Sequence, residues 1–378
     1  MPPADTDSAL YLDKPEAVER FLTEISDIKE LALDTEGASF HRFLDRIYLL
    51  QISTRERSAI IDPLPIGSPA RLGDLLQSNA VEVVFHDADY DLRLLHQDYG
   101  WHVTNIFDTR IASQLLGIKS FGLAALLEQF FDVKLDKKHQ RADWSMRPLT
   151  PDMLEYAAQD TRYLLQLKDH MNAELGRRGR LHWAKEEFAR LEGTRWEAEE
   201  SMEGFLRLKG ARDLSRRELA VLREVANWRD VVAAELDRAT FRVMGNEALF
   251  ELARRAPKSV SELSAIKGMP KGMIERAGND IVTAIRRGIE VPEAELPKFP
   301  RGQRWNKDRD FDDKVARLKA VRDAAATRLE LDPGVLCSRE RLENVARSGA
   351  KTVEELVAVP DLRRWQIEEM GGGFIAAL

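Results

Sequence analysis

The chain has 378 residues, of which 44% are hydrophobic and 32% are charged, and this length predicts two or three domains. Its net charge of −7 excludes a general attraction to nucleic acid, so phosphate binding would need local basic patches. Its single cysteine, Cys337, excludes an internal disulfide and a cysteine-based zinc site. No apolar run approaches the roughly 18 residues of a membrane span, and the N-terminus lacks a secretory signal, which predicts a cytoplasmic protein with no membrane contact.

Short β-type segments alternate with helical ones in the N-terminal part, a pattern typical of an α/β domain. Consecutive strands joined by short turns, which indicate an antiparallel meander, are predicted over residues 31–36, 46–53 and 57–62. A further strand over 81–86 lies between two predicted helices, over 71–77 and 88–99. A meander followed by strand–helix crossovers predicts a mixed sheet.

The next helix begins at Thr150-Pro151-Asp152, where a capping hydroxyl, a first-turn proline and an acid coincide. It is predicted to run to Gly176, and residues 181–200 continue as a charged helix. From about residue 210 onward no β pattern occurs, so the rest of the chain is predicted to be helical.

An internal repeat divides this helical part. The segment ALFELARRAPKSVSELSAI aligns with RLENVARSGAKTVEELVAV, so that Glu247 matches Glu340 and Leu263 matches Leu356, each 93 positions later. A constant offset predicts two copies of one helical module. A basic segment that contains prolines separates them, as expected of a linker.

The predicted organisation is therefore an N-terminal α/β domain with its own core, followed by two helical modules. The ranges are 1–200 for the α/β domain, 205–291 for the first module, 292–310 for the linker and 311–378 for the second module. Three windows, at 134–147, 203–217 and 296–310, each hold five Lys or Arg residues against two acids. Each is a candidate phosphate contact, although any one such window is more often a solvated surface than a binding site.

Acidic residues carry the strongest chemical signal. Asp34 and Glu36 stand two apart on a predicted strand, so both carboxylates project from one face, while Asp91 follows a strand and Asp160 lies on a helix. Clustered carboxylates raise one another's pKa unless cations compensate them, and hard oxygen ligands suit Mg²⁺ or Mn²⁺. Any one of these acids alone is better explained as a cap, and Asp87 competes with Asp91.

Tyr156 stands four residues before Asp160, so its phenol shares a helix face with that carboxylate. With this tyrosine, DTE (34–36), HDADYD (86–91) and YAAQD (156–160) resemble the three exonuclease motifs of the DEDD nucleases, in the tyrosine subgroup that includes the ribonuclease D family. The two helical repeats are similar to the HRDC module, which is known in tandem after this type of nuclease domain.

The resemblance implies an α/β ribonuclease-H-like exonuclease domain with a mixed sheet, followed by two all-α HRDC-like modules. It implies a 3′→5′ exoribonuclease with two divalent ions per active site, Mg²⁺ or Mn²⁺, that releases nucleoside 5′-monophosphates from RNA, notably tRNA precursors with 3′ extensions. By the same resemblance Asp34, Glu36, Asp91 and Asp160 are metal ligands and Tyr156 holds the attacking water. A monomer is expected.

Further substrate contacts are weaker predictions. Phe40, His41 and Trp144 are candidates for stacking on terminal bases, although such residues more often belong to a core. Lys267 and Lys271, in a glycine-containing turn of the first module, are candidates for phosphate contact, and a plain interhelix turn explains them nearly as well.

Two other functions stay open from the residues alone. The same acids serve 3′→5′ exodeoxyribonucleases, and no motif reports contact with a 2′-hydroxyl. A non-catalytic nucleic-acid-binding protein is the second alternative. The presence of all five motif residues argues against it.

Overall fold

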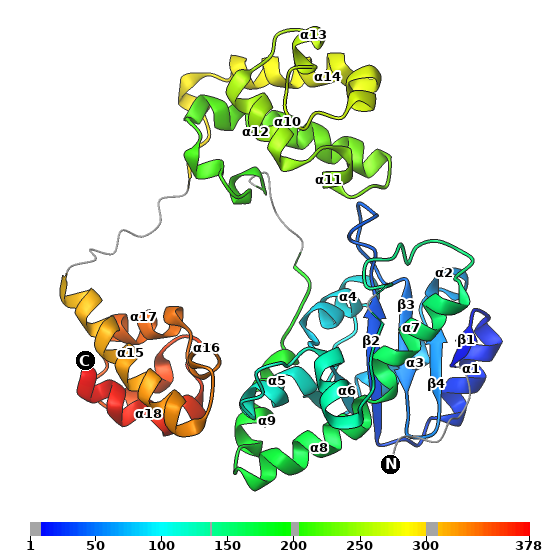
Figure 1. Cartoon of the computed structure of the whole chain (residues 1–378), viewed down its shortest axis with the longest axis vertical. Helices are drawn as coiled ribbons and strands as arrows, with labels where there is room; N and C mark the ends of the chain where they lie inside the picture. Colours follow the sequence, from blue (N-terminus) through cyan, green and yellow to red (C-terminus); the bar gives the residue numbers. More distant parts are fainter. Residues whose placement is uncertain (1–8, 137, 198–203, 300–308) are drawn as a thin grey trace. The chain divides into compact units, whose positions relative to one another are not determined.

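A computed structural model describes residues 9–136, 138–197, 204–299 and 309–378. Its contacts divide the chain into two compact units (Figure 1). The first contains the described residues of 1–37, 47–196 and 305–378, and the second those of 38–46 and 197–304. Lys137 and residues 300–308 of the predicted linker lie outside the described residues, as do parts of the two later basic windows.

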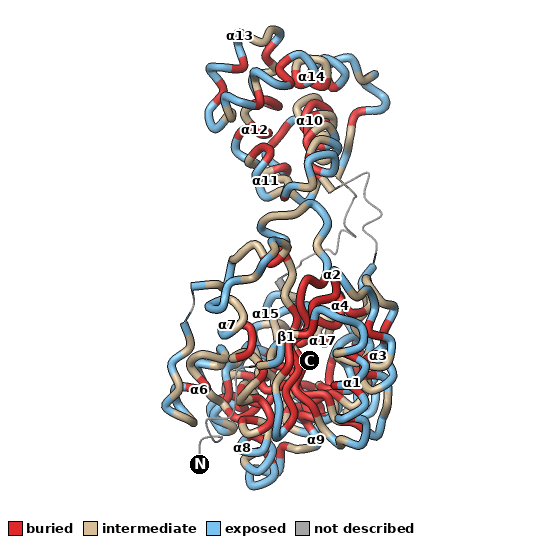
Figure 2. Tube along the Cα trace, turned by 90° about the vertical axis from the view of Figure 1, so that its right-hand side faces the viewer, coloured by how far each residue is buried: buried red, intermediate tan, exposed pale blue. Residues whose placement is uncertain are grey.

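A six-stranded mixed sheet forms the centre of the first unit, in the order β1-β4-β3-β2-β5-β6. Its strands are β1 (Leu10–Leu12), β2 (Glu30–Glu36), β3 (Leu49–Ser53), β4 (Ser58–Ile61), β5 (Glu82–Phe85) and β6 (Ile106–Asp108). Strands β2, β3 and β4 pair antiparallel, β5 is parallel to β2 and to β6, and β1 is parallel to β4. The predicted meander and mixed sheet are confirmed, and Figure 2 shows how thoroughly this sheet is buried.

Helices flank the sheet in chain order. They are α1 (Pro15–Glu24), α2 (Pro63–Ile66), α3 (Ala70–Leu76), α4 (Asp89–Tyr99), α5 (Thr109–Leu115), α6 (Leu123–Phe131), α7 (Pro151–Arg162), α8 (Leu164–Arg177) and α9 (Leu181–Leu191). The single helix expected over residues 150–176 is two helices, because the backbone at Tyr163, with φ −107° and ψ 0°, leaves helical geometry between them. The predicted start is confirmed, since the Thr150 hydroxyl accepts a hydrogen bond from the Met153 amide at 3.3 Å.

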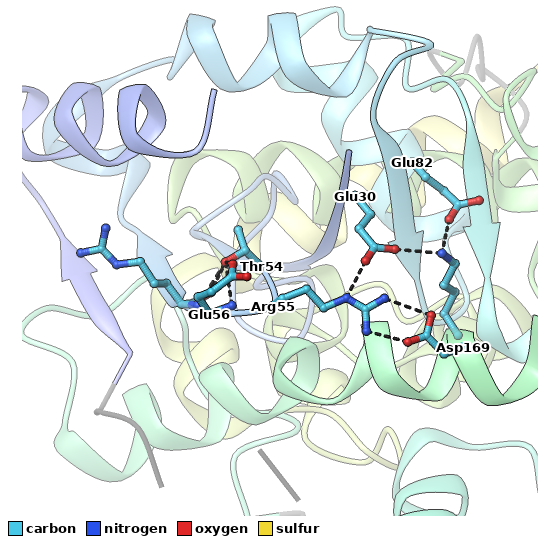
Figure 3. A network of polar contacts seen from close by, with 8 residues as sticks. Glu30, Thr54, Arg55, Glu56, Glu82 and Asp169 are labelled. Carbon is cyan, nitrogen blue, oxygen red and sulfur yellow. Dashed lines mark hydrogen bonds and ion pairs between the residues drawn. The ribbon is translucent and has the colours of Figure 1, made fainter. Parts of the chain in front are cut away.

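Helix α8 is tied to one end of the sheet by a charged network (Figure 3). Lys168 contacts Glu30 at 2.8 Å and Glu82 at 2.6 Å, and these two acids are direct partners across β2 and β5. Arg55 joins Glu30 to Asp169. Burial lowers the pKa of Lys168, but its hydrogen bonds to both glutamates outweigh that effect and raise the pKa above its usual value. The lysine thus compensates two carboxylates that would otherwise repel each other.

The two helical modules repeat the same elements. The first contains η1 (Gly204–Arg207), η2 (Ala211–Asp213), α10 (Arg216–Glu235), α11 (Thr240–Val243), α12 (Asn246–Arg255), α13 (Val260–Leu263), α14 (Lys271–Glu290) and η3 (Glu293–Glu295). The second contains α15 (Arg309–Leu329), α16 (Pro333–Leu336), α17 (Arg339–Ser348), η4 (Glu354–Ala358) and α18 (Arg364–Ala377). Helices α15, α16, α17 and α18 begin 93 positions after α10, α11, α12 and α14, so the repeat is confirmed at the level of structure.

The second module shares a hydrophobic core with α5, α8 and α9 of the α/β domain. Trp183 on α9 stacks on Trp365 of α18 with ring centroids 4.7 Å apart, and Trp365 Nε1 donates to Glu187 at 3.0 Å. Glu186 accepts hydrogen bonds from the Arg364 and Trp365 amides, which places a carboxylate at the N-terminus of α18, where the helix dipole favours it. A second core, over β2–β5 and the helices packed on them, lies within residues 1–200, so the α/β domain has a core of its own and also shares one with the second module.

Gly117 permits a close approach between the α/β domain and the second module. Its φ is +75°, and a Cβ at this position would lie 2.2 Å from the carbonyl oxygen of Glu330, in the loop after α15. A larger residue would be strained and would also push that loop away. Among the described residues, no helix is both long enough and apolar enough to cross a membrane.

Candidate active site

Strand β2 and helix α7 bring three of the predicted acids together. One carboxylate oxygen from each of Asp34, Glu36 and Asp160 lies within 4.8 Å of the others. The first two project from one face of β2 because side chains alternate along a strand, and α7 packs across β2, β3 and β4. The sheet and a single helix thus build a site from residues more than 120 positions apart.

Asp91 lies beside this cluster, in the first turn of α4, and is 5% exposed. Its Oδ1 accepts hydrogen bonds from the backbone amide of Thr35 at 2.9 Å and from the Thr35 hydroxyl at 2.6 Å. Thr35 stands between Asp34 and Glu36, so these two bonds attach α4 to the strand that carries them. The carboxylate is outside the group of oxygens within 4.8 Å but interacts electrostatically with Asp34 and Glu36.

Asp87, the competing acid, has a different environment. It is exposed, adopts a positive φ of 70° and forms an ion pair with Arg110. The turn that separates it from Asp91 is held by Asp108, whose two oxygens accept from the amides of Ala88 at 2.8 Å and Ile111 at 2.9 Å. The backbone therefore turns Asp87 toward Arg110 and places Asp91 against β2.

Asp91 is buried and the other three acids are half-buried, without compensating cations among the described residues. Burial, followed by the charge of neighbouring carboxylates, raises the pKa of Asp34 and of Glu36 well above the usual range. The same causes, with Asp91 as the neighbour, raise the pKa of Asp160 to about 7. Among the described residues, no lysine or arginine forms an ion pair with any of the four. Buried carboxylates of this kind ionise together only around cations, and their oxygens fit Mg²⁺ or Mn²⁺.

Tyr156 lies one helical turn before Asp160 on α7. Burial and then the charges of Asp160, Glu36 and Asp34 raise the pKa of its phenol, so the hydroxyl stays protonated near neutral pH. Its ring packs between His139 and Trp144, each with a centroid 6.0 Å away. A neutral phenol held beside an acidic cluster can donate or accept a hydrogen bond at the reacting centre.

Family models match most of the chain. A model for 3′–5′ exonucleases matches residues 10–176, and the HRDC domain model matches twice, at 218–285 and 313–378. A ribonuclease D from Nitrobacter hamburgensis is 30% identical over 92% of this chain and 89% of its own length. The chain belongs to the ribonuclease D family.

Other members of the ribonuclease D family match this chain over nearly its full length and have the same fold. A ribonuclease D from Granulibacter bethesdensis is 28% identical over 98% of this chain and 92% of its own length. The Escherichia coli RNase D structure, described as an exoribonuclease involved in structured RNA processing, superposes with a TM-score of 0.75 at 25% identity, covering 98% and 99% of the two chains. The protein is accordingly a hydrolytic 3′→5′ exoribonuclease with an RNA substrate.

Three polar residues of this ribonuclease D site were missed by reasoning from the sequence. Thr35 holds Asp91, and the hydroxyls of Ser53 on β3 and Thr161 on α7 are hydrogen-bonded at 2.8 Å. Because Thr161 directly follows Asp160, this second bond fixes the helix that carries the last acid. Thr35 could have been noticed as the middle residue of the first motif, whereas nothing in the sequence connects Ser53 to Thr161.

The weakly predicted substrate contacts have different environments in the structure. Trp144 is 1% exposed and its ring packs against Tyr156 inside the domain, which fits the core alternative better than stacking on a base. Phe40 is 44% exposed and lies in the second unit, edge-on to Phe241 at 6.4 Å. In the same unit, the carbonyl oxygen of His41 accepts a hydrogen bond from the Ala239 amide.

The two lysines of the first module occupy one turn. Lys267 is exposed and forms an ion pair with Glu247 at 2.7 Å, and Lys271 is the first residue of α14. Gly268, between them, has a φ of +76°. The turn itself is thus explained by the module's own packing, and phosphate contact by either lysine stays a prediction.

Proposed function

We propose that Asp34, Glu36, Asp91 and Asp160 hold two divalent metal ions, Mg²⁺ or Mn²⁺, for hydrolysis at the 3′ end of RNA. Bound there, the ions would supply a metal-activated water and neutralise the charge that develops on the leaving oxygen. The support is the cluster of Asp34, Glu36 and Asp160 oxygens within 4.8 Å, half-buried and without a cationic partner among the described residues. Asp91, fixed by Thr35, completes the ligand set.

Tyr156 is proposed to position the attacking water. Its phenol stays protonated because burial and the neighbouring carboxylates raise its pKa, so it serves as a hydrogen-bonding group and not as a general base. The ring contacts with His139 and Trp144 hold the phenol in place. The expected products are nucleoside 5′-monophosphates.

The physiological substrates are proposed to be structured RNA precursors, notably tRNA with 3′ extensions. The E. coli relative is described as acting in structured RNA processing, and the two HRDC modules add nucleic-acid-binding candidates to this chain. Phe40, with its exposed ring, and the Lys267 and Lys271 turn are the proposed contacts outside the acidic cluster. The domain division, the monomeric state and the cytoplasmic location stay predictions.

Metal removal tests this proposal directly. Excess chelator is expected to abolish degradation of 5′-labelled RNA, and Mg²⁺ or Mn²⁺ added beyond the chelator should restore it, because the buried acids cannot ionise together without cations. Strands labelled at the 3′ end, and matched DNA strands, report direction and sugar preference in the same assay. Undiminished RNA degradation in chelator would contradict the two-metal proposal.

Tyr156→Phe is expected to lower turnover by roughly 10²–10³-fold, the range for loss of one positioned hydrogen-bonding group at a reacting centre. Metal affinity and RNA affinity should stay close to those of the wild type, because the phenol serves the water and not the ligand set. Single-turnover rates and RNA binding with Ca²⁺ in place of Mg²⁺ separate the two effects. An affinity loss as large as the rate loss would indicate a substrate contact or a packing role instead.

A further inference from the structure

Gln51, in the middle of β3, has an unusual environment for a polar side chain. It is 0% exposed, and among the described residues neither its Nε2 nor its Oε1 has a hydrogen-bond partner. Burying a carboxamide without hydrogen bonds costs free energy at both its donor and its acceptor. An apolar side chain of similar shape would not have this cost. A hydrogen-bond partner for this side chain must therefore come from beyond the contacts that the described protein atoms make.

The register of the sheet places Gln51 beside the acids. It is the direct cross-strand partner of Asp34, so the two side chains project from the same face with Cβ atoms about 5 Å apart. Ser53, two residues further along β3 and on the same face, is hydrogen-bonded to Thr161 of α7. Gln51 thus lies beneath α7, between the strand that carries Asp34 and the helix that carries Asp160.

The helix leaves room for this side chain because its inward residues are small. Ala157 and Ala158, both buried, are the residues that α7 places against the sheet between Tyr156 and Asp160. A carboxamide at this position is flanked by the strand that carries Asp34 and by the helix that carries Asp160. The carboxylates on those two elements are therefore the polar groups that could take up its donor.

We propose that Gln51 is a positioning residue of the metal site. Its amide group donates to a carboxylate of the cluster, or to a water molecule held there, once the acids are ionised around metal ions. The inference rests on the proposed two-metal function and extends it to a residue outside the four acids. Groups that hydrogen-bond to metal ligands orient them, and their loss typically lowers metal affinity about 10–100-fold.

The test compares metal binding with stability in the full chain. Gln51→Leu removes both unsatisfied atoms with little change in volume, so the metal-free variant should unfold at the same temperature as the wild type or at a higher one. Its dissociation constants for Mn²⁺ and Mg²⁺, measured by titration calorimetry on metal-free protein, should rise by about tenfold or more. Gln51→Met repeats the test with a flexible apolar side chain in case leucine packs poorly.

Gln166→Leu is the matched control. The Oε1 of Gln166 is also buried without a partner among the described residues, but the residue lies on α8, which carries none of the four acids. Its metal affinity should equal that of the wild type.

Two results would overturn the inference alone, and a third would overturn the proposed function with it. Unchanged metal affinity in both Gln51 variants overturns the inference, and so does a loss of metal-free stability that accompanies the affinity loss, because it would assign the amide to packing. If the wild type itself binds neither ion, the proposed two-metal function fails, and the inference fails with it.

Discussion

Asp91→Asn is expected to lower turnover on RNA by about 10³-fold, since metal ions contribute several kcal/mol of transition-state stabilisation and each 1.36 kcal/mol is a factor of ten. The substitution removes the charge and leaves an oxygen that can still accept both hydrogen bonds from Thr35. The fold should therefore survive, because one of several mutually repelling buried acids has been replaced. Single-turnover degradation of 5′-labelled RNA at saturating Mg²⁺ measures the effect.

Asp87→Asn is the control for this prediction. Asp87 lies four residues earlier and is exposed, and its ion pair with Arg110 is of the surface kind that contributes about 0–1 kcal/mol to stability. Its substitution should change turnover less than about threefold, a difference below 1 kcal/mol. If Asp87→Asn proved the more damaging of the two, Asp91 would not be the acid of the second motif.

Trp365→Ala is expected to reduce the free energy of unfolding of the first unit by about 3–5 kcal/mol, the range for truncating a buried tryptophan. The ring is 1% exposed, stacks on Trp183 and donates to Glu187, so the variant loses contacts on both sides of the shared core. Urea unfolding followed by circular dichroism and by tryptophan fluorescence gives the change. The second module, from α15 to α18, should also become more sensitive to proteolysis.

Trp196→Ala provides a matched control, because this tryptophan is 41% exposed and only its backbone amide has a described hydrogen bond, to His96. Its effect should stay within about 0.5 kcal/mol. A double-mutant cycle with Trp183→Ala then measures the coupling between the stacked rings. Strictly additive losses would show that the two rings do not stabilise each other, and that the second module does not depend on α9.

Local patterns in the sequence were sufficient for much of the fold. The meander of β2, β3 and β4 follows from β-type segments with short turns, and the α7 start follows from Thr150 and its neighbouring proline. The 93-residue offset predicted a duplicated helical module because a repeat preserves both spacing and side-chain type. Strands β1 and β6 escaped prediction, since three residues are too few to show a period.

For the site, the motif residues were identifiable because their types and order are specific in combination, and three of the four acids meet where β2 and α7 cross. The sequence could not say that Asp87 turns toward Arg110 while Asp91 binds Thr35, because a positive φ at one residue decides it. Nor could it show that Trp144 is buried against Tyr156, since an aromatic residue near a motif is equally compatible with a core or a surface.

The family, the acids, the tyrosine and the repeat could therefore be identified from the sequence alone. Each of them depends on particular residue types at a short or constant spacing. Only the tertiary structure decided that the second module shares a core with α5, α8 and α9, and that Gln51 is buried without a partner beside Asp34. An amphipathic helix shows that one face will be buried but not against which partner. Alternation along β3 likewise shows a face but not the helix that covers it.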